Sequence, residues 1–200
     1  MKKLGILVSG RGSNMAAIIN ACEQGKLSAS VEVVISSNPD SLALVLAEEK
    51  KINTAHLGSH THPNPDALDA AMKDILYDHK VDYVLLAGFM KKIGPKMLLT
   101  YRGKIINIHP SLLPKFGGRG MYGINVHKAV IDAGEKESGV TIHLVDGEYD
   151  EGAILAQQCL IIEPEDTPAS LAAKILKIEH VLYAETIQKI IDDSIILPGN

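Results

Sequence analysis

The chain has 200 residues, of which 46% are hydrophobic, and a formal net charge of −4 from 24 acidic and 20 basic residues. No run of like charges indicates a nucleic-acid surface. The apolar stretch after Lys3 is too short for a signal peptide or a membrane span. Two cysteines, Cys22 and Cys159, fit neither a disulfide framework nor a structural zinc site. We therefore expect one domain over residues 1–200, located in the cytoplasm, that binds neither nucleic acid nor membrane.

Apolar runs alternate with helical patterns over the first half of the chain. The expected strands are 4–8, 31–36, 54–57 and 83–87, with a fifth in the stretch 104–114. The expected helices are one carrying Met15, Ile18, Ile19 and Cys22 on its apolar side, one at 42–51 and one at 66–79. This alternation predicts an α/β fold with a doubly wound, mostly parallel sheet and right-handed crossovers.

The pattern changes in the last third of the chain. Two strand-like runs, 139–145 and 153–162, are separated by a short acidic loop. Strands joined by so short a loop pair antiparallel, so we expect a hairpin at the edge of the sheet. A final helix is expected over 168–192, with Thr167 as its N-cap.

The most informative stretch reads KIINIHPSLLP at 104–114. Asn107 and His109 end a buried strand and, being two residues apart, point to the same face at the edge where parallel sheets place their chemistry. An amide that donates to an oxygen, beside a side chain that titrates near neutrality, indicates half of an acyl-transfer site. A structural histidine is the alternative. Ser111 follows a proline and lacks the strand-to-helix turn of an activated nucleophile, which favours a role in a turn.

A second motif, GRGSN at 10–14, follows the first strand. Glycines allow a close backbone approach, and the amides at the start of the next helix favour an anion. A dinucleotide fingerprint would have a third glycine at position 15, where this chain has Met15. The motif therefore favours a single phosphate over NAD, with a turn that binds nothing as the alternative.

A third candidate is Asp150, in the acidic loop between the two late strands. Near His109, its carboxylate would raise the pKa of the imidazole and keep the ring protonated. A solvated carboxylate is the alternative. His60 and His62 are spaced to chelate a metal weakly, but they have no third ligand nearby in sequence, so no metal is expected.

Five motifs in this order resemble those of the folate-dependent phosphoribosylglycinamide formyltransferase family: GRGSN at 10–14, LAGFMKKI at 86–93, NIHPSLLPKF at 107–116, VDGEYDEG at 145–152 and IEHVLY at 178–183. The resemblance runs over nearly the whole chain. It implies transfer of a formyl group from the co-substrate 10-formyltetrahydrofolate to the amine of glycinamide ribonucleotide, in purine synthesis.

The resemblance also assigns roles by matching position. It implies a catalytic group of Asn107, His109 and Asp150. The ribonucleotide phosphate would be bound by Gly12, Ser13 and Asn14, and its ribose by Glu179. The folate pocket would be lined by Met90, Lys91, Lys92 and Ile93, together with Asn107. The expected partners are small molecules, and the expected state is a monomer or homodimer.

The chain departs from the family pattern at three places. A glycine-rich loop at 116–123, FGGRGMYG, stands where many members have a short PG, and it resembles a subgroup of the family. Lys91 stands where arginine is common. Pro65 replaces an arginine that touches the folate in some members. We expect a different folate affinity or pose.

The mechanism implied is a direct attack of the amine on the formyl carbon. Asn107 and protonated His109 would stabilise charge on the formyl oxygen, and Asp150 would hold His109 charged and order a proton-relaying water. Three rivals stay open: a formyltetrahydrofolate hydrolase and a methionyl-tRNA formyltransferase, whose members usually carry a further domain, and a non-enzymatic nucleotide-binding domain.

Overall fold

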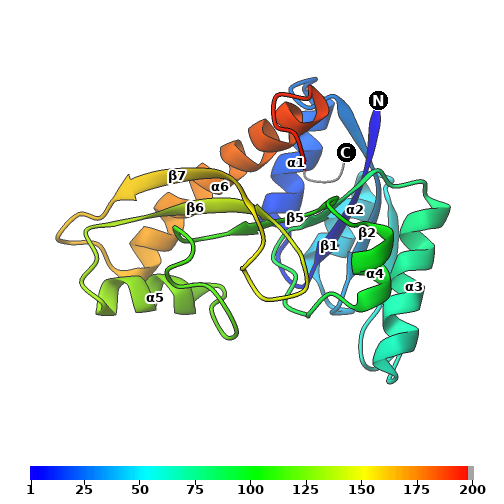
Figure 1. Cartoon of the computed structure of the whole chain (residues 1–200), viewed down its shortest axis with the longest axis horizontal. Helices are drawn as coiled ribbons and strands as arrows, with labels where there is room; N and C mark the ends of the chain where they lie inside the picture. Colours follow the sequence, from blue (N-terminus) through cyan, green and yellow to red (C-terminus); the bar gives the residue numbers. More distant parts are fainter. Residues whose placement is uncertain (198–200) are drawn as a thin grey trace.

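The computed structural model describes residues 1–197, which are built around one seven-stranded sheet (Figure 1). In chain order the elements are β1 (Lys2–Val8), α1 (Ser13–Glu23), β2 (Ala29–Ser36), α2 (Leu42–Glu49), β3 (Asn53–His56), α3 (Pro65–Asp78), β4 (Tyr83–Leu86), α4 (Pro95–Thr100), β5 (Ile105–His109), α5 (Ile124–Asp132), β6 (Glu137–Leu144), β7 (Ile154–Ile161) and α6 (Pro168–Ile191). The strand order is β3-β2-β1-β4-β5-β6-β7. Strands β1 to β5 are parallel to one another. Strand β6 runs antiparallel to β5, and β7 runs antiparallel to β6. The predicted doubly wound sheet with a late antiparallel hairpin is confirmed.

Helices cover both faces of the sheet. Helices α1, α2 and α6 pack on the face that receives Leu4, Ile6 and Val8 of β1. Helices α3 and α4 pack on the other face, which receives Leu7. Side chains alternate along a strand, so a strand covered on both faces reads as a continuous apolar run. The hairpin of β6 and β7 extends beyond the rest of the sheet, with α5 beside it (Figure 1).

The strand order reverses between β1 and β4. From β1 the chain builds the sheet outward through β2 to β3, and from β4 it builds the sheet in the opposite direction through β5 to β7. Such a switch point opens a crevice at the carboxyl ends of the strands. Ser9 ties the strand ends together there: its hydroxyl lies 2.7 Å from that of Ser37 and accepts from the Met90 amide at 3.0 Å. The loops that follow β1, β2 and β4 are therefore held side by side.

Helices α4 and α5 were not predicted from the sequence. The first turn of α4 is capped by a residue of another helix, because the Asp69 carboxylate accepts from the amides of Lys96 at 2.7 Å and Met97 at 3.1 Å. A cap supplied from α3 leaves no capping side chain in the local sequence, where Pro95 at the first helical position is the start signal. Thr167, in contrast, caps α6 through its own hydroxyl, as predicted, and the structure adds a capping box with Ser170. Within residues 1–197, no helix combines the length and apolarity that crossing a bilayer requires.

Candidate active site

A cavity of about 490 Å³ lies at the carboxyl ends of β4 and β5. Its walls come from four segments that are far apart in the sequence: 88–93, 107–110, 118–123 and 147–150. Leu86 of β4, His143 of β6 and Val145 just after β6 complete the lining. This volume is within the range of small-molecule sites. The cavity therefore combines the strand end and the acidic loop that the sequence indicated.

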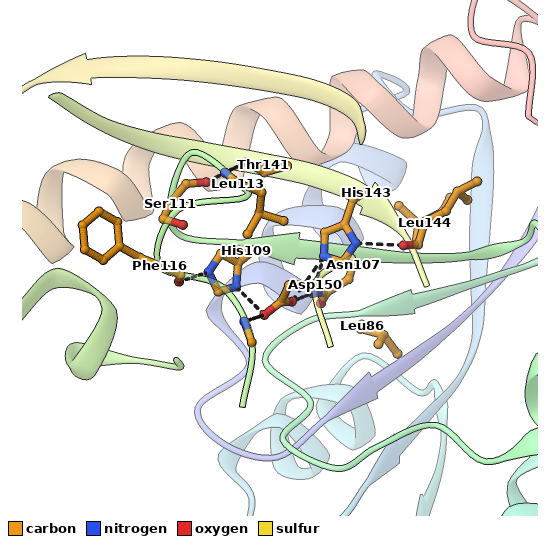
Figure 2. Close-up of polar contacts among 12 residues, drawn as sticks. Leu86, Asn107, His109, Ser111, Leu113, Phe116, Thr141, His143, Leu144 and Asp150 are labelled. Carbon is orange, nitrogen blue, oxygen red and sulfur yellow. Dashed lines mark hydrogen bonds and ion pairs between the residues drawn. The ribbon is translucent and has the colours of Figure 1, made fainter. Parts of the chain in front are cut away.

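The three predicted catalytic side chains meet in this cavity (Figure 2). The Asp150 carboxylate lies 3.6 Å from Nδ1 of His109 and 3.5 Å from Nδ2 of Asn107. Its side chain is 11% exposed, so it faces the imidazole and not bulk water. The structure thus brings the strand end and the distant loop together.

His143 belongs to the same cluster, although sequence reasoning did not single it out. It stands directly opposite Asn107 in the β5–β6 pair. Its Nδ1 donates to the carbonyl of Leu144 at 2.8 Å, so in the neutral ring Nε2 accepts from the Asn107 amide at 3.0 Å. Nε2 also lies 3.5 Å from Asp150. The sequence feature that could have identified His143 is its place in the alternating run 139–145, where it is a polar residue on the strand face opposite Val140 and Ile142.

His109 is 4% exposed and has an acceptor beside each ring nitrogen. Nε2 donates to the carbonyl of Phe116 at 2.8 Å, and Nδ1 faces Asp150. Burial and, to a smaller extent, the neighbouring His143 lower the pKa of His109 by more than the Asp150 carboxylate and the Phe116 carbonyl raise it. The expectation that Asp150 would hold this pKa above its ordinary value was wrong, because the desolvation of the ring is the larger effect.

Asp150 is held by contacts on three sides. Its backbone has a φ of 59°, in the left-handed region that asparagine and aspartate tolerate better than most residues. The amide of Gly118 donates to Oδ2 at 2.8 Å. Burial raises the pKa of Asp150, but His143, His109 and the Gly118 amide together leave it below its ordinary value. The carboxylate is therefore ionised at neutral pH.

The phosphate-loop candidate forms the turn from β1 into α1. Gly12 has a φ of 77° and precedes the helix, and a Cβ there would lie 2.6 Å from the Cβ of Ala43. Glycine is required for both reasons. Because Gly12 has no side chain to cap α1, the amides of Ser13 and Asn14 stay available to an anion.

Asn14 and Glu179 also meet, from α1 and α6. The Asn14 amide lies 3.3 Å from the Glu179 carboxylate, and the buried Oδ1 of Asn14 has no hydrogen-bond partner among the described residues. Burial raises the pKa of Glu179 to about 7, although Asn14 acts in the opposite direction. This polar pair lies next to the phosphate loop, and both features lie outside the lining of the 490 Å³ cavity.

The predicted folate residues all line the cavity. Met90 is half exposed, whereas Ile93 is buried in the sheet core. Lys92 forms an exposed ion pair with Glu148 at 3.2 Å, across the mouth of the cavity. Lys91 is exposed beside them. Pro65 is the first residue of α3 and does not line the cavity, so it takes no part in this wall.

Two further predictions concern Ser111 and metals. The Ser111 hydroxyl is fully buried and donates to the carbonyl of Lys115 at 2.7 Å, which is a turn contact. In the part of the chain that the structure describes, no group of three or more His, Cys, Asp or Glu side chains is arranged to hold a metal ion.

Comparison with known proteins gives consistent relatives. A family model described as Formyl transferase matches residues 2–187. The chloroplastic phosphoribosylglycinamide formyltransferase of Arabidopsis thaliana is 40% identical over 195 residues, or 97% of this chain and 67% of that protein. The Haemophilus influenzae phosphoribosylglycinamide formyltransferase is 39% identical over 183 residues, or 92% of this chain and 84% of that one. The crystal structure of glycinamide ribonucleotide transformylase 1 from Symbiobacterium toebii superposes with a TM-score of 0.92 at 34% identity, covering 100% of this chain and 92% of that one.

Proposed function

The chain belongs to the formyl transferase family, and we propose that it transfers the formyl group of 10-formyltetrahydrofolate to the amine of glycinamide ribonucleotide. The observation that carries the proposal is the meeting of Asn107, His109 and Asp150 at one end of a cavity. A phosphate-binding turn lies at the adjoining strand end. The single sheet with two apolar faces supports one domain over 1–200, of which 198–200 lie outside the described residues.

The ribonucleotide is bound at the start of α1. Its phosphate accepts from the uncapped amides of Ser13 and Asn14, where the positive end of the helix dipole favours an anion. The ribose hydroxyls then reach Glu179, which lies 3.3 Å from Asn14. This orientation directs the amine away from α1, across the strand ends and towards Asn107.

The formylfolate occupies the 490 Å³ cavity as a co-substrate. Residues 88–93 form one wall, with Lys91 and Lys92 at the exposed end, where carboxylates of the folate tail find cationic partners. The glycine-rich loop 118–123 forms the opposite wall. Lys91 replaces the usual arginine as a single-point cation, so the tail is bound less rigidly there.

The reaction forms one bond and breaks one bond at the formyl carbon. The neutral amine attacks, and negative charge grows on the formyl oxygen, to which Nδ2 of Asn107 donates. A protonated His109 donates to it from Nδ1, because its Nε2–H is held by the Phe116 carbonyl at 2.8 Å. The new amide retains the formyl carbon, the bond to the folate nitrogen breaks, and the amine proton passes to that nitrogen. His109 is buried, but a positive charge on its ring is attracted by the Asp150 carboxylate, which lies 3.6 Å from Nδ1. The imidazolium is thus favoured at the moment when the oxyanion forms.

The Asp150 contacts fit this sequence of events. The contact to the Asn107 amide is long, at 3.5 Å, whereas the Gly118 amide donates at 2.8 Å. A substrate oxygen can replace Asp150 at Asn107 at small cost, while the Gly118 amide and a protonated His109 retain the carboxylate. Aligning two bound substrates contributes a further part of the acceleration, roughly 7 to 11 kcal/mol in favourable cases.

A label-transfer assay tests the proposed function. Formylfolate carrying an isotope in its formyl group is incubated with the protein and glycinamide ribonucleotide, with methionyl-tRNA, or with neither acceptor, and the products are separated. Calorimetry measures the binding of the ribonucleotide and of a folate analogue. We expect the label in the formylated ribonucleotide, and negligible release without it. Free formate in the absence of ribonucleotide indicates a hydrolase, and transfer only to methionyl-tRNA indicates the other rival. Ribonucleotide binding without folate binding indicates a non-enzymatic domain. The cytoplasmic location and the monomer or homodimer state stay predictions.

A further inference from the structure

One short stretch of backbone contacts both members of the His109–Asp150 pair (Figure 2). The carbonyl of Phe116 accepts from Nε2 of His109 at 2.8 Å. The amide of Gly118, two residues later, donates to Oδ2 of Asp150 at 2.8 Å. Both contacts are shorter than the 3.6 Å between the imidazole and the carboxylate themselves. The backbone of segment 116–118 therefore contacts His109 and Asp150 at shorter distances than these two side chains contact each other.

The conformation of this segment is unusual. Phe116 has a φ of 56° and Gly118 a φ of 92°, both in the left-handed region. A phenylalanine there costs conformational free energy, which the surrounding structure has to offset. The result of this geometry is that the carbonyl of Phe116 points to His109 and the amide of Gly118 to Asp150.

Gly117 lies directly against the carboxylate residue. A Cβ at position 117 would lie 3.1 Å from the Cβ of Asp150, 3.7 Å from its Oδ2 and 2.6 Å from Cδ2 of Leu113. Its own φ lies outside the left-handed region, so space and not backbone conformation requires glycine here. A side chain at 117 would displace Asp150 or Leu113.

We propose that segment 116–118 is a backbone clamp that sets the position of Asp150 relative to His109, with Gly117 as a positioning residue for the reaction. The expected effect on kcat rests on the proposed function, whereas the positioning of Asp150 by this backbone does not depend on which reaction the protein catalyses. The other groups that face this carboxylate are Asn107 and His109 from β5 and His143 from β6.

The clamp continues into the wall of the cavity. The amide of Met121 donates to the carbonyl of Gly118 at 3.1 Å, and Gly120 has a φ of 90°, which closes a turn with Arg119 at its corner. Arg119 and Met121 line the cavity. A folate molecule that contacts this turn therefore acts on the same backbone that holds Asp150, which links occupancy of the cavity to the alignment of the pair.

A double-mutant cycle tests the positioning role. Gly117→Ala is measured alone and in the Asp150→Asn background, with kcat and both KM values determined for each. We expect kcat to fall roughly 10- to 100-fold in the first background, as displacement of a reacting group does, with both KM values unchanged within about twofold. In the Asp150→Asn background the further loss should be less than about twofold. Equal losses in the two backgrounds, or no loss at all, would overturn the proposal.

Gly134→Ala serves as the control. Gly134 has a φ of 67° and follows the end of α5, and a Cβ added there would have no neighbouring atom of residues 1–197 within 4 Å. The variant introduces more backbone strain than Gly117→Ala does, but it lies away from the cavity. Its kcat should equal that of the wild type. Thermal unfolding of both variants is measured alongside, and unfolding temperatures close to that of the wild type would show that the loss of kcat does not follow from loss of fold.

A second measurement does not depend on catalysis. Gly118 is replaced by glycolate, which turns its amide into an ester and deletes the N–H, and the pKa of Asp150 is followed by NMR of a ¹³C-labelled carboxyl. We expect this pKa to rise, because the ionised form loses a hydrogen-bond donor. An unchanged pKa would overturn the clamp. If the wild type transfers no formyl group, the proposed function fails, while the NMR titration still decides whether the clamp exists.

Discussion

The ribonucleotide half and the reaction half of the proposed site are built in different ways. The phosphate turn is one contiguous stretch between β1 and α1, fixed by the conformation of Gly12 and its packing on Ala43. The reaction half draws Asn107 and His109 from β5, His143 from β6 and Asp150 from a loop. A contiguous binding turn tolerates changes elsewhere in the chain. A pair assembled from separate segments depends on each of them, so we expect the largest mutational effects there, and on kcat.

The first and largest effect concerns His109→Ala and Asp150→Asn. Removing either group deletes proton transfer or its support, and we expect kcat to fall by roughly 10² to 10⁴. The Kd of the ribonucleotide should stay within about twofold of the wild type, because its phosphate is bound at α1. Steady-state kinetics and calorimetry measure the two quantities. Near-normal turnover in either variant would refute its role.

His143→Ala should have the next largest effect. His143 is 1% exposed, accepts from the Asn107 amide at 3.0 Å and lies 3.5 Å from Asp150, so its removal frees the amide that donates to the reacting oxygen and opens space beside the carboxylate. We expect kcat to fall by roughly 10- to 100-fold, with KM little changed. Loss of a buried side chain also destabilises the fold, so the unfolding free energy is measured alongside. A variant that is less stable but fully active would show a structural role alone.

Glu179→Gln tests the ribonucleotide half. The pKa of Glu179 is raised from 4.5 to about 7 in the folded protein, so the folded state binds this proton more tightly than the unfolded state. The resulting stabilisation is present below pH 4.5 and is lost as the pH rises to about 7, on the order of 3 kcal/mol. Because glutamine stays neutral, the variant should match the wild type in unfolding free energy at low pH and exceed it above pH 7.

The same variant separates binding from stability. If the ionised Glu179 accepts from ribose hydroxyls, the ribonucleotide should bind more tightly to the wild type as the pH rises through 7. Glu179→Gln should lack this change and retain only the pH dependence of the phosphate. Calorimetric titration of both proteins at several pH values measures the difference. Identical pH profiles would remove Glu179 from the ribose site.

Lys92→Ala should have the smallest effect. The Lys92–Glu148 pair is exposed at the mouth of the cavity, where such pairs contribute roughly 0 to 1 kcal/mol to stability. We expect an unfolding free energy within about 0.5 kcal/mol of the wild type, and a KM for the folate that rises more at low salt than at high salt. A large fall in kcat would place Lys92 in the chemistry instead.

The fold was predictable from the sequence because its signals are local. Continuous apolar runs indicated β1, β2 and β4, and Thr167 indicated the start of α6. Helix α4 was not predicted, because its cap is the distant Asp69. In the site, the alternation of side chains along a strand placed Asn107 and His109 on one face. The sequence indicated that Asp150 lies near His109, but it gave no distance between the carboxylate and the imidazole. His143 was overlooked, since its pairing with Asn107 depends on the register of β5 and β6.

The electrostatics of the site were the least predictable part. The sequence shows that a carboxylate and an imidazole are available, but the pKa of His109 depends on how far burial outweighs the attraction of Asp150. That balance follows from tertiary packing and from the Phe116 carbonyl. No pattern of residues along the chain predicts which of these two effects on the pKa of His109 is larger.

A crystal structure with a folate analogue and the ribonucleotide both bound tests the central claim most directly. The account predicts a phosphate on the amides of Ser13 and Asn14, an amine about 3 to 3.5 Å from the formyl carbon, and a formyl oxygen within hydrogen-bonding distance of Asn107 and His109. A formyl oxygen that points away from both side chains, with Asp150 turned to solvent, would contradict it.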